Sequence, residues 1–195
     1  AQETETTSVQ TQLSSKNLKK LQDYEVSLSK AFDVIRTEPV QEKRFEATTA
    51  FVPKLVEALK VPNSFYYNFD SLKNISVLRA PDNSFRIFSW LVVQQGRDQY
   101  DFTYKYYGAI QYNSGELKLT GLQDKSSRIS RANARELDAE NWYGVLYYDI
   151  TQYTYKDTSY YMLFGWDGNN HRSDKKIADI LFFRDDKPIF GSPVF

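Results

Sequence analysis

The sequence contains no cysteine, a single histidine and a single methionine. The lack of cysteine excludes disulfides, thiolate nucleophiles and Cys-ligated metals, and a catalytic relay through histidine has only His171 to use. Lysine plus arginine equals aspartate plus glutamate at 25 each, so net charge gives no argument for nucleic acid or an anionic membrane as a partner. No apolar run approaches the roughly 18 residues of a membrane span. We therefore expect no metal, no cofactor and no transmembrane segment.

The chain begins Ala-Gln-Glu without a methionine, which fits an exported protein after removal of its signal peptide, or a trimmed chain. We expect export. Export without disulfides points to a bacterial envelope, in the periplasm or at the outer membrane, more than to an animal extracellular space. The missing cysteine also removes the acyl anchor of a bacterial lipoprotein.

Aromatic residues divide the chain, because only four of them precede residue 65. Residues 1–15 are polar and predict a flexible tail. Residues 16–61 carry apolar side chains at helical spacing, with an interruption at Thr37-Glu38-Pro39. This pattern predicts a hairpin of two helices.

From residue 62 to residue 195 the apolar pattern changes to period two, with turn residues between the runs. About seven or eight short strands predict an antiparallel, aromatic-rich β-meander that is a sandwich, a barrel or a curled open sheet. The fold class is therefore α+β. The apolar ending 189–195 reads as a strand whose neighbours lie beyond it, so we expect the β domain to continue.

The clearest strand spans residues 100–112, where one side is almost entirely aromatic and the other is mostly polar. We expect the aromatic side to face a core and the other side mostly to face water. The aromatic side consists of Tyr100, Phe102, Tyr104, Tyr106, Ile110 and Tyr112.

A polar interval before residue 141 is compatible with a helix, because Asn133 and Glu136 have the spacing of a capping box. Arg128, Arg131 and Arg135 are separated by three and four residues, which on a continuous helix would align them to bind phosphate or carboxylate. A helix that begins at Asn133 would break this alignment. The alternative is a solvated surface.

Asp149 and Asp179 are carboxylates within expected strands. If they converge in a cleft, burial can raise one pKa while the other group stays ionised, as a hydrolase with an acid and a base requires. The alternative is that both face solvent from a half-exposed sheet.

The polar segment from Trp166 to Asp174 reads as a turn, and it contains His171. Its oxygen-bearing side chains are of the kind that binds calcium, but the segment lacks the alternating acidic positions and terminal glutamate of an EF-hand. A turn filled with Asp and Asn side chains is the alternative. The oxygen ligands would be Asp167, Asn169, Asn170 and Asp174.

Trp90, Trp142 and Trp166 are the aromatic side chains best suited to stack against sugar rings. This is the basis for a glycan-binding module. The alternative is that all three pack in the core.

Several strings, with the segment Lys175-Lys176-Ile177 and the ending 190–195, resemble an uncharacterised family of exported Bacteroidota proteins over roughly residues 65–195. The resemblance implies a periplasmic or surface-associated protein and supplies no activity or catalytic residues. It also makes Asp70-Ser71-Leu72 similar to an O-glycosylation sequon, with Ser71 as acceptor; an unmodified turn is the alternative. The strings are Phe69-Asp70-Ser71-Leu72-Lys73-Asn74-Ile75-Ser76, Ala80-Pro81-Asp82-Asn83-Ser84-Phe85-Arg86-Ile87-Phe88-Ser89-Trp90, Asn141-Trp142-Tyr143-Gly144 and Tyr160-Tyr161-Met162-Leu163-Phe164-Gly165-Trp166-Asp167-Gly168-Asn169-Asn170.

The sequence favours a non-catalytic binding or accessory subunit of a larger complex, with protein partners in the cell envelope. Two alternatives stay open. One is a carboxylate-dependent hydrolase of glycans or envelope polymers, and the other is a glycan-binding module. Neither a phosphate-binding loop nor a nucleophile elbow occurs in the sequence, so an enzyme is the less favoured class.

Overall fold

The computed structural model describes residues 13–96, 101–170 and 172–191. They belong to two compact units. The first consists of Ala1–Asn74 with Tyr112–Lys118, and the second of Ile75–Gln111 with Leu119–Phe195. Helices form most of the first unit and strands most of the second.

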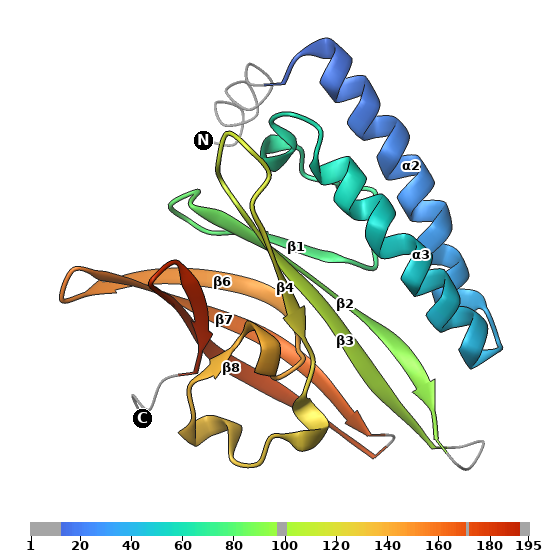
Figure 1. The fold of residues 1–195 in the computed structure, drawn as a ribbon. Helices are drawn as coiled ribbons and strands as arrows, with labels where there is room; N and C mark the ends of the chain where they lie inside the picture. The colour runs from blue at the N-terminus through green and yellow to red at the C-terminus, as the bar shows by residue number, and fades with distance from the viewer. Residues whose placement is uncertain (1–12, 97–100, 171, 192–195) are drawn as a thin grey trace. The chain divides into compact units, whose positions relative to one another are not determined.

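The first unit contains two long helices, α2 (Ser15–Thr37) and α3 (Gln41–Leu59), which lie side by side as an antiparallel hairpin (Figure 1). Their apolar stripes meet, and the rings of Phe32 and Phe51 pack edge to face at 5.5 Å between centroids. Pro39 lies in the break between the helices, as the sequence predicts. The predicted helical hairpin is confirmed. Neither helix combines the length and the apolar character that crossing a membrane would require.

A buried carboxylate ties the segment after α3 and the short 3-10 helix η1 (Ser64–Tyr66) to α2. Glu25 accepts hydrogen bonds from the Ser71 N–H at 2.6 Å and from the Tyr67 hydroxyl. Burial, together with the charge of Glu25, raises the pKa of Tyr67 above its ordinary value.

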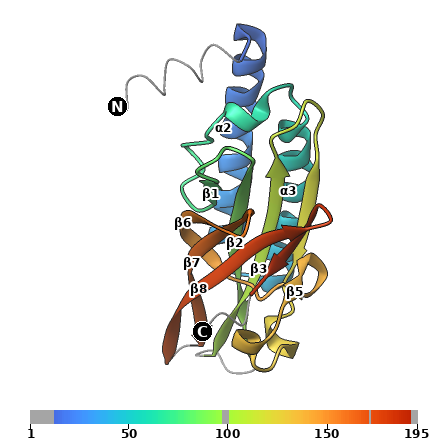
Figure 2. The same cartoon turned by 90° about the vertical axis from the view of Figure 1, so that its left-hand side faces the viewer.

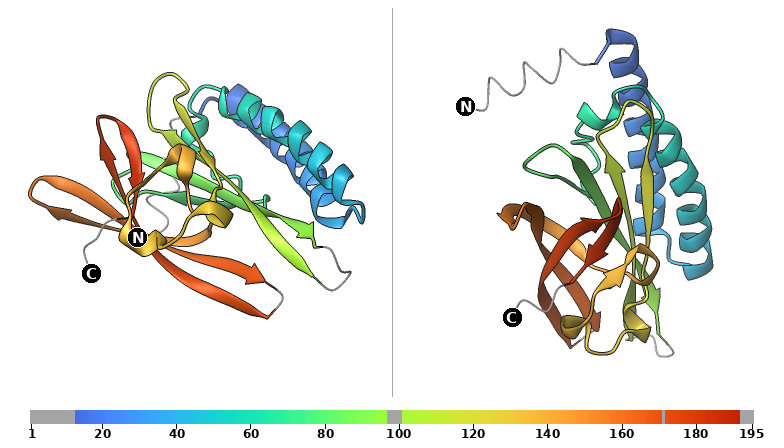
Figure 3. Two further views of the ribbon diagram at one scale, coloured as in Figure 1. Left: turned by 60° about the horizontal axis from the view of Figure 1, so that its bottom comes forward. Right: turned by 60° about the vertical axis from the view of Figure 1, so that its left-hand side comes forward.

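The second unit contains nine described strands in two antiparallel sheets, and neither sheet closes into a barrel (Figures 1 and 3). The α+β prediction is confirmed. The first sheet has the order β1 (Ser76–Arg79), β2 (Phe85–Gln95), β3 (Phe102–Tyr112) and β4 (Leu119–Gln123). The second has the order β5 (Leu137–Asp138), β9 (Lys187–Phe190), β8 (Ser173–Arg184), β7 (Thr158–Asn170) and β6 (Leu146–Tyr155).

Aromatic side chains join the inner faces of the two sheets. Phe85 of β2 packs edge to face against Tyr161 of β7, at 4.7 Å, and its ring lies 5.2 Å from that of Phe183 of β8. A polar contact adds to this packing, because the Tyr147 N–H of β6 donates to Ser89 Oγ of β2 at 3.1 Å. Aromatic rings therefore form much of the packing between the two sheets.

The burial of side chains along strand β3 agrees only in part with the alternation in the sequence. Tyr106 and Ile110 are buried on the aromatic side, as expected. The side that was expected mostly to face water carries Gln111, which is 3% exposed, and Tyr107, whose ring stacks on Trp90 at 5.6 Å. The expectation of a water-facing side is wrong for this end of the strand, because period two separates two faces without identifying which of them is covered.

The C-terminal strand β9 is not an open edge of its sheet. It pairs with β8 on one side and with β5 on the other, through Leu137 and Phe190. Strand β5 lies in the irregular segment between β4 and β6 (Figure 2). The expectation that the neighbours of this strand lie beyond the ending is therefore wrong for Lys187–Phe190; residues 192–195 lie outside the described part of the chain.

Candidate functional site

A cavity of about 500 Å³ lies in the second unit between strand β8 and the irregular segment that follows β4. The irregular segment contributes Ile129, Arg131, Asn133 and Leu137, and the strand contributes residues 175–180. Its volume is within the roughly 300–1,000 Å³ range typical of ligand sites. Charged groups and apolar side chains both line the cavity. The charged groups can orient a ligand, and the apolar side chains provide contact area.

Strand β8 has an uncovered edge along this cavity. Strand β9 pairs with β8 only from Leu181 to Arg184, and the last bond on this side runs from the Gly191 N–H to the Ile180 carbonyl at 2.7 Å. The peptide groups of successive residues in a strand point to alternate sides, so those of Lys176 and Ala178 point to the same side as those of Ile180. Among the described residues, no backbone hydrogen bond reaches Lys176 or Ala178 from this side.

Asp179 is a half-buried carboxylate in the cavity wall. Its Oδ2 accepts a hydrogen bond from the Tyr147 hydroxyl at 2.8 Å, and the Tyr147 oxygen in turn accepts from Trp142 Nε1 at 3.0 Å. Burial raises the pKa of Asp179 to about 6, although Tyr147 and the N–H groups of Gly191 and Ile180 favour the ionised form. Asp179 therefore changes charge near neutral pH.

The wall beside Lys175 is held by a second carboxylate, Asp167, which is 6% exposed. Asp167 accepts hydrogen bonds from the hydroxyls of Tyr143, at 2.8 Å, and Tyr106, at 3.2 Å. Lys175 Nζ lies 3.4 Å from Asp167 Oδ2 and 3.2 Å from the Tyr143 oxygen. Burial opposes the charge of Lys175, but Tyr143 and Asp167 raise its pKa above the ordinary value, so the charged ammonium is favoured at this position.

The geometry of Asp167 corrects the expected turn. Strand β7 continues to Asn170 and β8 begins at Ser173, so Asp167 lies in a strand on the inner face of its sheet. Its oxygens are occupied by tyrosine hydroxyls and a lysine. No cluster of acidic side chains suited to a metal occurs among the residues described. His171 lies outside those residues.

The arginine-rich interval does not form the expected helix. Two 3-10 helices, η2 (Ser126–Arg128) and η3 (Ala132–Ala134), flank Arg131, whose φ of 54° is left-handed. Glu136 binds Arg184 at 2.9 Å instead of capping a helix. The three arginines therefore do not align on one helix face.

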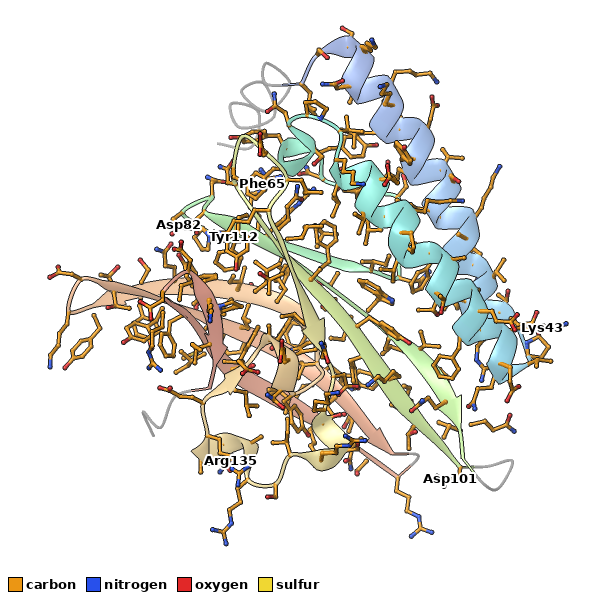
Figure 4. The ribbon with its side chains drawn as sticks, viewed as in Figure 1. Lys43, Phe65, Asp82, Asp101, Tyr112 and Arg135 are labelled. Carbon is orange, nitrogen blue, oxygen red and sulfur yellow. The ribbon has the colours of Figure 1, made fainter. Side chains whose placement is uncertain are left out.

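Only one of the three arginines, Arg131, lines the cavity. Arg128 and Arg135 are exposed, and Figure 4 shows the Arg135 side chain pointing away from the ribbon. The helical spacing therefore selected three candidates of which the structure places one at a site.

Asp149 and Asp179 do not form a pair of carboxylates. Asp149 pairs across the sheet with Phe164, whereas Asp179 pairs with Leu163. Cross-strand partners share a face and consecutive residues of a strand point to opposite faces, so the two carboxylates lie on opposite faces of the sheet. Asp149 is also exposed.

Two of the three tryptophans belong to the core. Trp90 is 3% exposed and Trp142 is 0% exposed. Trp166 is half-buried, packs against Tyr104 at 5.4 Å, and donates from Nε1 to Asp174 Oδ2 at 2.9 Å. Only Trp166 keeps part of its surface for a ligand, which weakens the argument for a glycan platform.

Ser71, the expected glycosylation acceptor, lies in a turn of the first unit with its side chain exposed. Its backbone N–H is engaged by Glu25 at 2.6 Å. Modification at this residue stays a prediction.

Sequence reasoning did not identify Tyr143, Lys175 or Lys176 as site residues, although all three line the cavity. The only local signal was the pair of adjacent lysines where the expected strand that contains Asp179 begins. Nothing in the sequence relates that pair to a segment some 40 residues earlier, because only tertiary packing brings the two together. No protein-family model, curated protein or solved structure matches this chain.

Proposed function

We propose that this protein is a non-catalytic binding protein that takes an acidic ligand into the cavity beside β8. The observation that carries this proposal is the charge of the cavity wall, which bears Arg131, Lys175 and Lys176. Asp179 lies in the same wall, and Asp167 behind it pairs with Lys175. Arg131 and Lys176 therefore supply the cations without a carboxylate partner of their own among the described residues of the wall. Basic side chains placed around a concave, partly apolar site favour carboxylate or phosphate groups.

The three cations have different roles in this proposal. Lys175 is held by Tyr143 and Asp167, so its position is fixed before a ligand arrives. Arg131 and Lys176 are exposed, and Lys176 Nζ lies 5.5 Å from the centre of the Tyr148 ring. The charges of Arg131 and Lys176 remain hydrated, so these residues attract an acidic ligand with little desolvation cost. Added salt screens part of that attraction.

Binding is favoured over hydrolysis by the placement of the carboxylates. A carboxylate-dependent glycoside hydrolase needs two carboxyl groups about 5–10 Å apart on either side of one bond. Asp149 and Asp179 lie on opposite faces of the sheet and so do not supply such a pair.

A direct test uses fluorescently labelled peptides of four glutamates or four lysines and measures their binding by fluorescence anisotropy at low salt and at about 0.15 M salt. We expect the acidic peptide to bind and the basic peptide not to bind. The double variant Arg131→Glu/Lys176→Glu should lower the affinity for the acidic peptide by about tenfold or more, because two favourable charges become unfavourable.

The matched control is Lys156→Glu/Lys187→Glu, which makes the same change in net charge at two exposed lysines outside the cavity wall. This control should bind the acidic peptide nearly as tightly as the original protein. An equal loss in both double variants would show that only overall charge matters, and it would overturn the proposal. So would the absence of binding by the original protein.

We also propose that the protein works in a bacterial envelope with a protein partner. The support is the resemblance of residues 65–195 to exported Bacteroidota proteins. Osmotic-shock fractionation of the native cells, followed by immunodetection, should place the protein with periplasmic or outer-membrane markers. Recovery only with cytoplasmic markers would contradict this location.

A further inference from the structure

We infer that the ligand of the cavity is an extended acidic segment of a partner protein, which adds to the uncovered edge of β8 in line with β9. This inference rests on the proposed binding of an acidic ligand at the same cavity. It goes further because it names a macromolecular partner, its backbone conformation and the hydrogen bonds that hold it.

The backbone of β8 provides the first reason. Strand β8 runs from Ser173 to Arg184, and β7 pairs with it over most of that length, but β9 covers only its last four residues. Beyond the bond from Gly191 to Ile180, the peptide groups of Ala178 and Lys176 point to the same side of β8 as those of Ile180, and both residues line the cavity. Two residues of this kind offer two donors and two acceptors in the arrangement that an added strand satisfies.

The cavity supplies room for that strand. Neighbouring strands lie about 4.8 Å apart, so an edge covered closely by a loop cannot accept another chain. Here the cavity of about 500 Å³ separates β8 from Ile129, Arg131 and Leu137. The irregular segment therefore forms one wall of the cavity and β8 forms another.

The side chains along β8 favour an acidic occupant. Residues that face each other on neighbouring strands share one face of a sheet. An acidic side chain of the added strand next to Lys176 would meet its ammonium, and Arg131 lines the same cavity from the irregular segment. On the other face, Ile177 lies between Lys175 and Asp179, and it favours an apolar side chain at the position beside it. The expected ligand thus alternates acidic and apolar residues.

Lysines on a strand edge also have a protective role, because they discourage pairing with unrelated chains. Protection and recognition make different predictions. If the lysines only protect the edge, they discourage basic and neutral strands, and an acidic strand that binds them forms no hydrogen bonds with the backbone of β8. If they recognise a partner, the bound strand forms backbone hydrogen bonds with Lys176 and Ala178.

The experiment uses a labelled six-residue peptide of alternating glutamate and valine, and two versions in which every second amide is N-methylated, in opposite registers. N-methylation removes a donor and adds bulk, and a strand presents every second N–H to the same side. The version methylated on the side that faces β8 should bind about tenfold or more weakly, since it loses two hydrogen bonds. The other version should bind like the unmodified peptide.

A second measurement reads the protein instead of the peptide. The amides of Lys176 and Ala178 should become protected from hydrogen exchange when the unmodified peptide is added, while exchange at the exposed Asp157 turn should not change. Tight binding of both methylated versions would overturn strand addition, but it would remain consistent with the proposed binding of an acidic ligand at the cavity. If neither the unmodified peptide nor the tetraglutamate peptide binds, the proposed function fails as well.

Discussion

Replacing Asp179 by asparagine is expected to raise the free energy of unfolding at pH 8 by about 2 kcal/mol. A carboxyl with a pKa of about 6 in the folded protein and 3.8 in the unfolded chain loses about 3 kcal/mol of folding free energy when it ionises. Asparagine removes this cost and keeps one oxygen that accepts from the Tyr147 hydroxyl. Its amide nitrogen cannot accept a second hydrogen bond, and this loss offsets about 1 kcal/mol of the gain in stability.

The size of the stabilisation by Asp179→Asn should depend on pH. Burial favours the protonated form of Asp179, so the folded state holds this proton more tightly than the unfolded state. The stabilising contribution is complete below pH 3.8 and is lost as the pH rises through about 6. The difference in unfolding free energy between the variant and the original protein should therefore grow from pH 4 to pH 6 and then level off.

Denaturant unfolding at a series of pH values measures this difference, and Asp149→Asn is the matched control on the exposed, opposite face of the sheet. This control removes one exposed carboxylate, so it separates the loss of a charge from the loss of the carboxyl beside Tyr147. A constant difference for Asp179→Asn between pH 4 and pH 8 would contradict the raised pKa. The same substitution removes the only carboxylate of the cavity wall, so acidic peptides should bind somewhat more tightly to it at pH 8.

Replacing Gln111 by leucine is expected to lower the free energy of unfolding by about 3 kcal/mol, because it removes an acceptor from a buried charge. Arg86 is 0% exposed, and its Nε donates to Gln111 Oε1 at 2.8 Å. Burial, with a smaller contribution from Arg79, lowers the pKa of Arg86 below its ordinary value. A guanidinium in such surroundings depends on each oxygen that accepts from it.

A double-mutant cycle tests this dependence. Arg86→Met/Gln111→Leu replaces both polar partners by apolar side chains of similar size, and its loss should be smaller than the sum of the two single losses. Gln123→Leu, at an exposed position in β4, serves as a control and should be close to neutral. Strict additivity in the cycle would show that Gln111 does not stabilise the charge of Arg86.

Local patterns were sufficient for the elements that depend on neighbours in sequence. Apolar residues three and four apart predicted both helices, and the interruption at Thr37-Glu38-Pro39 indicated where the first one stops. Period-two alternation predicted the aromatic strand of residues 100–112, which corresponds to β3, since a half-buried strand needs one apolar side whatever it packs against. The prediction for the segment between β4 and β6 was wrong: a helix was expected, but three short 3-10 helices have no periodicity long enough to recognise.

The candidate site shows the limit of this reasoning. Asp179 was identified from its residue type within an expected strand, but its proposed partner Asp149 lies on the opposite face of the sheet. Whether a carboxyl is buried beside a tyrosine or exposed to water depends on residues far away in the chain, and its pKa follows from that burial.

The sequence by itself determined the α+β class, the helical hairpin and most of the strands of this protein, because propensity and periodicity act over a few neighbouring residues. Only the tertiary structure decided the sheet order, which places β9 between β8 and β5 and leaves part of β8 uncovered. It also decided that Arg131 and Lys176 share a cavity. These features depend on contacts between residues distant in sequence, whose partners no local pattern specifies.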